Sequence, residues 1–232
     1  MELSLPIPDF QAGQTLLFNK PKGWTSFDVV KKVRGLIRIK KVGHAGTLDP
    51  LATGLLILCT GKHTKQINQI QELEKEYEVV FKLGATTASY DAEFPEEHIR
   101  DASHISREQL EAGMREFAGE IEQVPPVFSA VKVDGQRAYK AARKGKSVQL
   151  RPRRVQVYAF ELLDYPSPAE AQALVRCSKG TYIRSLVHDL GQRLGVGAYI
   201  RELRRSRIGH YRLEDAWEIP DFEAWIKSGR AG

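Results

Sequence analysis

Residues 77–83 read YEVVFKL, and this segment has the pattern of a β-strand. Apolar side chains occupy every second position from Tyr77 to Leu83, with Glu78 and Lys82 between them. A period of two is typical of a strand that packs one face on a core and turns the other face to water. The segment therefore predicts a half-buried strand, and with it a protein built around a sheet.

Further strands and helices are predicted on both sides of this segment. The alternation recurs over residues 127–133 and 155–163, and the apolar residues 55–58 indicate another strand. Helical spacing of apolar residues predicts helices over residues 26–38, over residues 106–117 and after Thr181. Because strands and helices do not alternate regularly, we expect an α+β fold with a mixed, mostly antiparallel sheet flanked by helices.

The chain has the length and composition of a soluble globular protein. It contains 232 residues, of which 42% are hydrophobic, and this is enough to bury a substantial core. No repeat and no linker rich in Pro and Ser divides it. The composition shifts to acidic residues over about 84–124, which we expect to form an inserted lobe within one catalytic domain spanning residues 1–232.

The sequence gives no indication of secretion, membrane insertion or a metal site. Cys59 and Cys177 are far apart and lack a CxxC spacing, and the histidines show no HExxH or HxH pairing. The N-terminus lacks the basic and apolar pattern of a signal peptide. The longest apolar run, residues 55–59, is far shorter than the ~20 residues of a membrane span. We expect a cytoplasmic protein without a metal.

Charge is unevenly distributed along the chain, whose formal net charge is +6. Basic residues dominate residues 31–41, 132–154 and 176–212, whereas residues 70–122 are mainly acidic. If the basic segments share a face, they form a positive groove for a polyanion. Nucleic acid is therefore the favoured partner, although such runs also occur as ordinary solvated faces.

The segment most informative about chemistry is residues 43–54, which read GHAGTLDPLATG. Three glycines and a proline in this segment predict a loop between the basic helix and the apolar strand. Asp49 is the only acid between Asp28 and Glu72. An ionised carboxylate in basic surroundings can act as a covalent nucleophile. The alternative is an ordinary turn in which Asp49 bonds its own backbone.

Five motifs in order along the chain carry a resemblance to a known family. They are NKPKGWTS at residues 19–26, KVGHAGTLDPLATG at 41–54, KEY at 75–77, PPVFSAVK with GQRAY at 125–139, and GTYIRSL at 180–186. Together they resemble the TruB family of tRNA pseudouridine synthases, which isomerise uridine 55 of the T loop. The resemblance implies the pseudouridine synthase fold, with an active-site groove across the sheet.

The chain departs from the family pattern in two places. Many bacterial members carry a C-terminal PUA-type RNA-binding domain, and the chain ends too soon after Arg212 for one, so we expect a short form that grips tRNA differently. Ala45 stands where most members have Thr, a change too small to alter the chemistry. The resemblance implies that no cofactor or metal is needed, and we expect a monomer whose partner is the T-stem loop of tRNA.

The resemblance assigns three catalytic residues. Asp49 is the nucleophile, which either attacks the ribose C1′ or begins an elimination to a glycal. Tyr77 stacks on the uracil, which must be flipped out of its loop to be reached, and its hydroxyl can act as a base. Arg184 is the partner of Asp49, because a guanidinium can keep a carboxylate ionised and oriented. Its position outside the apolar stripe of its helix equally permits a plain surface arginine.

Four further residues are assigned to RNA binding by the same resemblance. His44 fills the gap that the flipped base leaves in the T loop, or is simply a loop histidine. Tyr182 lines the pocket. Lys20 and Lys132 either contact phosphate or support the active-site loop. Other basic residues supply salt-dependent attraction to the RNA backbone rather than base recognition.

Two other functions are compatible with these features. An RNA chaperone that opens and refolds the tRNA elbow needs only the basic groove and His44. A related synthase could modify another RNA, such as ribosomal RNA, or depend on a guide RNA. Activity of the protein alone on a T-loop stem-loop excludes dependence on a guide RNA, and mapping of pseudouridine in total RNA from a strain lacking the gene separates the remaining possibilities.

Overall fold

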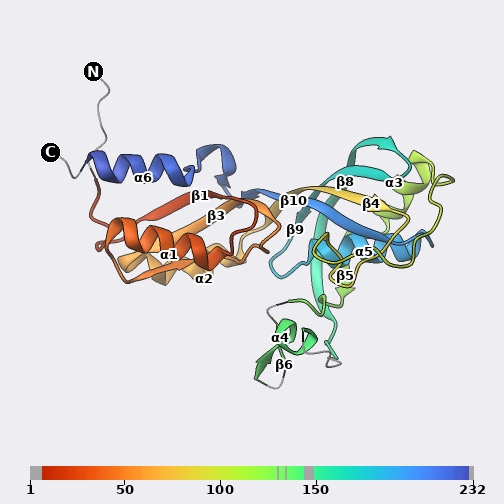
Figure 1. Cartoon of the computed structure of the whole chain (residues 1–232), viewed down its shortest axis with the longest axis horizontal. Helices are drawn as coiled ribbons and strands as arrows, with labels where there is room; N and C mark the ends of the chain where they lie inside the picture. Colours follow the sequence, from red (N-terminus) through yellow and green to blue (C-terminus); the bar gives the residue numbers. More distant parts are fainter. Residues whose placement is uncertain (1–6, 130, 134, 144–148, 230–232) are drawn as a thin grey trace. The chain divides into compact units, whose positions relative to one another are not determined.

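The computed structural model describes residues 7–129, 131–133, 135–143 and 149–229. The chain divides into two compact units (Figure 1). The first unit comprises Met1–Lys75 and Arg204–Gly232, and the second comprises Glu76–Leu203. The acidic stretch predicted as an inserted lobe belongs to the second unit. The single catalytic domain over residues 1–232 stays a prediction.

A small sheet forms the centre of the first unit. Its middle strand β3 (Thr53–Thr60) pairs antiparallel with β1 (Thr15–Lys20) and with β2 (Val42–His44). The end of β10 (Ala198–Ile208) pairs with β3 in parallel and with β11 (Tyr211–Arg212) antiparallel. Because β3 lies between partners, its hydrogen-bonding groups are satisfied along most of its length.

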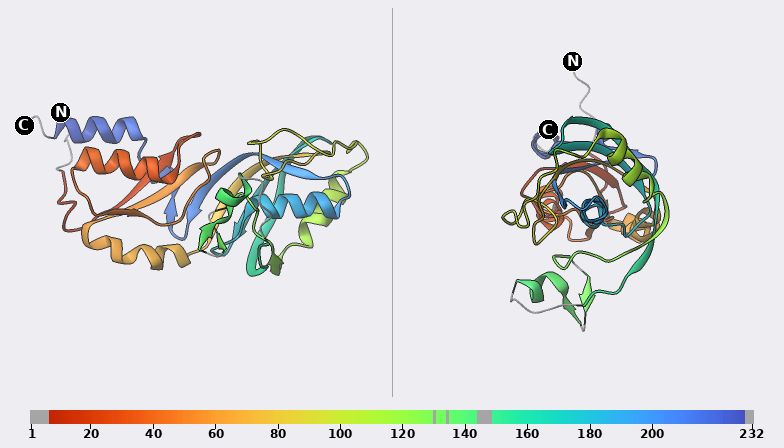
Figure 2. Two further views of the ribbon diagram at one scale, coloured as in Figure 1. Left: turned by 60° about the horizontal axis from the view of Figure 1, so that its bottom comes forward. Right: turned by 90° about the vertical axis from the view of Figure 1, so that its right-hand side faces the viewer.

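Both faces of β3 are covered, which explains its continuous apolar sequence. Leu56 and Leu58 belong to a core with α1 (Ser26–Ile37) and α6 (Ile219–Ser228). The alternate side chains pack into a second core, which includes Ile70 of α2 (Ile67–Glu72). The 3₁₀ turn η1 (Gly61–Gln66) joins β3 to α2. Figure 2 shows α1 and α6 on one side of the strands and α2 on the other. A strand buried on both faces needs apolar residues at every position.

A second group of strands forms the sheet of the other unit, in the order β10-β4-β9-β8-β5. The long hairpin of β8 (Arg153–Ser167) and β9 (Glu170–Cys177) is antiparallel, as is the pairing of β5 (Gly119–Gln123) with β8. Helix α3 (Arg107–Arg115) contacts β8 and helix α5 (Ile183–Arg193). The remaining elements of the unit are β4 (Lys75–Leu83), β6 (Lys132–Val133), β7 (Gln136–Arg137) and α4 (Ala138–Ala142).

The structure confirms the α+β class, the mixed and mostly antiparallel sheet, and most of the predicted elements. Thr25 and Ser106 cap α1 and α3, each with a complete capping box. The prediction of a strand over residues 127–133 is wrong, because only Lys132–Val133 is extended and paired. The carbonyl of Phe128 accepts a hydrogen bond from the Arg184 side chain. A side chain from elsewhere in the chain therefore satisfies the Phe128 carbonyl in place of a neighbouring strand.

Candidate active site

The loop that carries Asp49 connects β2 to β3 within the first unit. The amide of Ala52 donates to the carbonyl of Asp49 at 3.1 Å, which closes a turn. Ahead of this turn the amide of Ala45 donates to the carbonyl of Ile57 at 2.9 Å. This turn is closed by main-chain groups, and the Asp49 side chain is partly exposed. Both roles considered for the Asp49 carboxylate, as a nucleophile and as a bond to its own backbone, stay predictions.

Helix α1 supports the middle of this loop. The hydroxyl of Ser26, buried in the first turn of the helix, accepts from the Leu48 amide at 2.9 Å and lies 3.2 Å from the Leu48 carbonyl oxygen. The amide of Gly23 donates to the carbonyl of Pro50 at 2.8 Å. The main chain is therefore held on both sides of Asp49 by the segment that enters α1.

Lys20 is fully buried at the end of β1. Its ammonium donates to the carbonyls of Trp24 at 2.7 Å, Pro21 at 3.0 Å and Pro50 at 3.3 Å. Burial lowers the pKa of Lys20 to about 8, and the Asp49 carboxylate acts in the opposite direction. An ammonium with no exposed surface cannot reach an RNA phosphate without rearrangement. Of the two roles expected for Lys20, the geometry favours support of the loop.

His44 lies at the end of β2, where the loop begins. Burial and the nearby positive charge of Arg205 hold the pKa of His44 below its usual value. The imidazole is therefore neutral at pH 7. A neutral ring costs less to place against an RNA base than a charged one, which is compatible with the role expected for His44.

Arg184 and Tyr77 belong to the second unit. Tyr77 lies on β4 and is almost fully buried. Arg184 is only 4% exposed, so it is not the plain surface arginine that the sequence also permitted. Its guanidinium donates to the carbonyls of Ser89 and Phe128, each at 2.9 Å.

Asp91 is the residue that sequence reasoning missed. Its carboxylate lies 3.6 Å from the Nε of Arg184, and it is itself 6% exposed. The carboxylate also accepts from the Ser89 hydroxyl and from the Glu93 amide. No local motif marks Asp91 in the sequence, where it is one of many acids in the acidic stretch.

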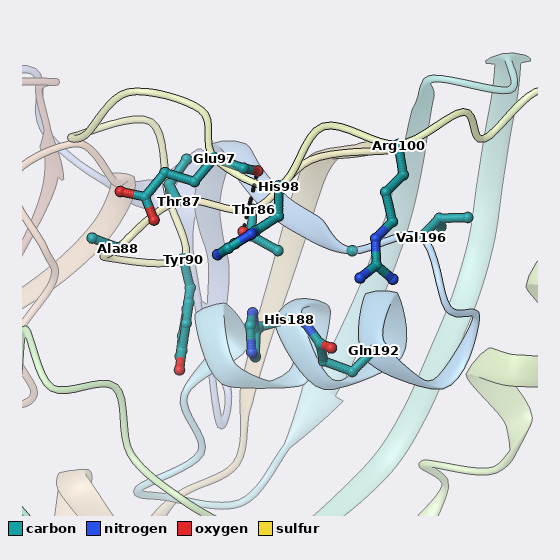
Figure 3. Close-up of a pocket in the computed structure, with 11 residues that line it drawn as sticks. Thr86, Thr87, Ala88, Tyr90, Glu97, His98, Arg100, His188, Gln192 and Val196 are labelled. Atoms are coloured by element: carbon teal, nitrogen blue, oxygen red, sulfur yellow. Dashed lines mark hydrogen bonds between the residues drawn. The ribbon is translucent and has the colours of Figure 1, made fainter.

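The loop that carries Asp91 is fastened to α5 by an aromatic contact one turn beyond Arg184. Tyr90 stacks on His188, with ring centroids 3.7 Å apart and planes inclined by 14°. Figure 3 shows Tyr90 reaching from its loop to lie beside His188 on the helix. The two residues line a cavity of about 430 Å³. Burial keeps the pKa of His188 below its usual value.

Tyr182 precedes the first residue of α5. Its main chain is fixed by Gln123, whose side chain accepts from the Tyr182 amide at 2.7 Å and donates to the Tyr182 carbonyl at 3.1 Å. The guanidinium of Arg153 lies 4.9 Å from the centre of the Tyr182 ring, a cation–π contact. The remaining predicted residue, Lys132, lies on β6, and its side chain is outside the part of the chain that the structure describes.

The residues that the structure describes contain no group of three or more His, Cys, Asp and Glu side chains placed to hold an ion. No helix in this part of the chain combines the length and the apolar character needed to cross a bilayer.

Two protein-family models match consecutive parts of the chain. The one described as TruB family pseudouridylate synthase (N terminal domain) matches residues 34–183, and the one described as tRNA pseudouridylate synthase B C-terminal domain matches residues 184–231. The chain belongs to the TruB family. As a TruB-family pseudouridine synthase it is an isomerase that acts on RNA.

Curated relatives of this TruB-family chain are similar over nearly its whole length. The tRNA pseudouridine synthase B of Bacteroides thetaiotaomicron is 50% identical over 229 residues, covering 94% of this chain and 95% of the relative. The enzyme of the same name from Flavobacterium johnsoniae is 44% identical and covers 93% of this chain and 96% of the relative. That of Thermobifida fusca is 46% identical, and the match covers 92% of this chain but 75% of the relative.

Solved structures share the fold. An archaeal box H/ACA sRNP Nop10–Cbf5 complex matches with a TM-score of 0.71 and 25% identity, covering 99% of this chain and 62% of the matched one. A Cbf5–Nop10–Gar1 complex matches with a TM-score of 0.71 and 27% identity, covering 98% and 64%. The TruB-family chain thus spans less than two thirds of the matched chains. These matches confirm the pseudouridine synthase fold.

Proposed function

We propose that the protein converts uridine 55 in the T loop of tRNA to pseudouridine, with Asp49 as the nucleophile. The observation that carries this proposal is the Asp49 loop: its sequence matches the family motif, and its main chain is held by Lys20 and Ser26. The relatives named tRNA pseudouridine synthase B support tRNA as the substrate.

The reaction rearranges one nucleoside and conserves all its atoms. The bond between uracil N1 and the ribose C1′ breaks, the uracil turns, and a bond forms between C5 and C1′. C5 then loses its proton, and N1 gains one. Two routes begin at the Asp49 carboxylate, either attack on C1′ or an elimination that leaves a glycal. Neither route consumes a cofactor, because the isomerisation needs no oxidant and no group donor.

Asp49 acts together with two residues of the second unit. In this proposal Tyr77 stacks on the flipped uracil, and its hydroxyl accepts the C5 proton. Arg184 keeps the Asp49 carboxylate ionised and oriented. Within its own unit Arg184 is fixed by Asp91 and by two main-chain carbonyls, so a restrained guanidinium is available for this role.

The remaining assigned residues hold the RNA. Extruding a base from a folded loop costs a few kcal/mol, and the neutral ring of His44 offsets part of this cost by filling the vacated space. Tyr182 contacts the nucleotide, and Lys132 contacts the backbone or supports the loop. The net charge of +6 favours binding to a polyanion. We further propose that the protein acts as a monomer in the cytoplasm, on the T-stem loop.

An assay on an isolated T-loop stem-loop tests this function. The wild-type protein should form pseudouridine at position 55 without other components, and a stem-loop with cytidine at that position should stay unmodified. If the protein promotes tRNA folding but modifies no uridine, the chaperone is the whole function. Pseudouridine mapping in total RNA from a strain lacking the gene should show loss at position 55 of tRNA, and loss elsewhere would point to another RNA.

A further inference from the structure

Arg205 is a fully buried arginine at the end of β10, in the unit that carries Asp49. It is 1% exposed. A guanidinium removed from water is costly unless its donors are satisfied. In Arg205, Nε donates to the carbonyl of Leu55 at 2.8 Å, and the two terminal nitrogens donate to the carbonyls of Gly46 at 3.2 Å and Thr47 at 3.5 Å.

These carbonyls lie on both limbs of the Asp49 loop. Gly46 and Thr47 precede Asp49, whereas Leu55 follows it on β3. One side chain therefore joins the entrance of the loop to its exit. The planar fork of a guanidinium suits this task because its donors point in several fixed directions, whereas a lysine ammonium is a compact charge on a flexible stem.

The main chain of Arg205 is itself attached to the loop. It pairs with Gly54 in the parallel bridge between β10 and β3. Gly54 has a φ of +99°, and a side chain there would collide with the carbonyl group of Arg205. The main chain of Arg205 is thus fixed against Gly54, after Asp49, and its guanidinium reaches Gly46 and Thr47, before Asp49.

The placement of Arg205 also has an electrostatic consequence for its neighbours. The positive charge of Arg205 contributes to the lowered pKa values of both Lys20 and His44. Lys20 holds the carbonyl of Pro50, directly after Asp49. Two buried cations therefore hold the main chain before and after the carboxylate that the proposed function uses.

We infer that Arg205 is a positioning residue, which fixes the main chain of residues 46–55 and so sets the place of the Asp49 carboxylate. This inference rests on the proposed role of Asp49. In this role Arg205 acts through the loop that carries Asp49. Its loss should affect the chemical step much more than RNA binding, because catalytic geometry is more sensitive to displacement than the overall grip on a polyanion.

The test compares Arg205→Lys with Arg107→Lys under single-turnover conditions. Arg107 is an exposed arginine of α3 that pairs with Glu111, so its variant makes the same chemical change on an element that does not carry the loop. In Arg205→Lys the rate of pseudouridine formation should fall by about 10²-fold, while the Kd for the T-loop stem-loop changes by less than about threefold. Arg107→Lys should keep the wild-type rate. A wild-type rate in Arg205→Lys, or an equal loss in the Kd, would overturn the inference.

A second measurement needs no activity and separates this inference from the proposed function. In the free protein, amide exchange at Ala45 and Leu48 should accelerate by about tenfold or more in Arg205→Lys, while the β1–β3 amides stay protected. Unchanged exchange at the loop would contradict the inference even if the enzyme modifies another RNA. Arg205→Gln is the second variant, and global unfolding of both variants would also contradict it, because Arg205 would then stabilise the whole unit.

Discussion

The Nε atom of Arg184 lies 3.6 Å from a carboxylate oxygen of Asp91, and both side chains are almost fully buried. Asp91 is held in turn by the Ser89 hydroxyl and the Glu93 amide. A buried charge that is paired and hydrogen-bonded in this way has few alternative positions. The second unit therefore supplies Arg184 as a fixed group before any RNA is bound.

Replacing Asp91 by Asn should impair both stability and catalysis. The substitution removes the Asp91 charge that lies beside the buried Arg184 guanidinium, and removing one member of a buried pair costs roughly 3–5 kcal/mol of unfolding free energy. The single-turnover rate should fall by about 10²-fold. Glu93→Gln on the same loop is the matched control, because Glu93 pairs with the exposed Arg143. Equal rates for Asp91→Asn and the wild type would show that this pair is not needed.

Ser26→Ala should slow the reaction, whereas Thr25→Ala should not. Each variant loses one hydroxyl from the start of α1 and should be destabilised by about 1 kcal/mol. Only Ser26 bonds the main chain of Leu48, next to Asp49. Chemical denaturation and single-turnover assays on both variants check this. A parallel loss of rate would mean that helix stability, and not the loop contact, sets the rate.

Stability should fall as the pH decreases below about 6.5, in part because of His188. Burial lowers the pKa of His188 in the folded protein, so the unfolded chain binds more protons below the ordinary histidine pKa. Its contribution to stability is present above that pH and is lost as the pH falls through it. His188→Phe keeps a ring against Tyr90 and removes the titration.

The variant isolates this effect from other groups that titrate nearby. His44, whose pKa is also lowered, is present in both proteins, as is Asp189, whose pKa is raised to about 6 by burial and which acts in the opposite direction. Urea unfolding at pH 7.5 and at pH 5.5 should show a smaller loss of stability in His188→Phe than in the wild type. A larger loss in the variant would reverse the sign and contradict the assignment.

Local signals in the sequence were sufficient to predict the helices α1, α3 and α5 and the loop, whereas α2, α4 and α6 were not predicted. Capping boxes at Thr25 and Ser106 mark the starts of α1 and α3 because their hydrogen bonds span only three residues. Glycines and a proline mark residues 43–54 as irregular for a similarly local reason. The alternating pattern of residues 127–133 gave a wrong prediction, since the carbonyl of Phe128 bonds the distant Arg184 side chain and only Lys132–Val133 pairs with a short neighbouring strand.

Which charged residues are buried could not be predicted from their neighbours in the sequence. Arg205 lies in a basic stretch of the sequence, yet it is buried and bonded to main-chain carbonyls far along the chain. For Lys20 the sequence left open a phosphate contact or support of the loop, and the fold shows that this lysine is buried and bonded to Pro50. Asp91 likewise resembles its acidic neighbours. Whether a charged residue is exposed or buried depends on partners that the fold brings to it, and a single sequence does not reveal those partners.

The central claim is that the Asp49 carboxylate performs the chemistry. The direct measurement is the single-turnover formation of pseudouridine at position 55 of a T-loop stem-loop by Asp49→Asn, with the Kd measured in parallel. If Asp49 is the nucleophile, the rate of Asp49→Asn should be at least about 10³-fold below that of the wild type, because the amide cannot act as the nucleophile. The Kd of the variant should stay within about threefold of the wild-type Kd. A rate within about tenfold of wild type, at unchanged affinity, would show that Asp49 is not the nucleophile.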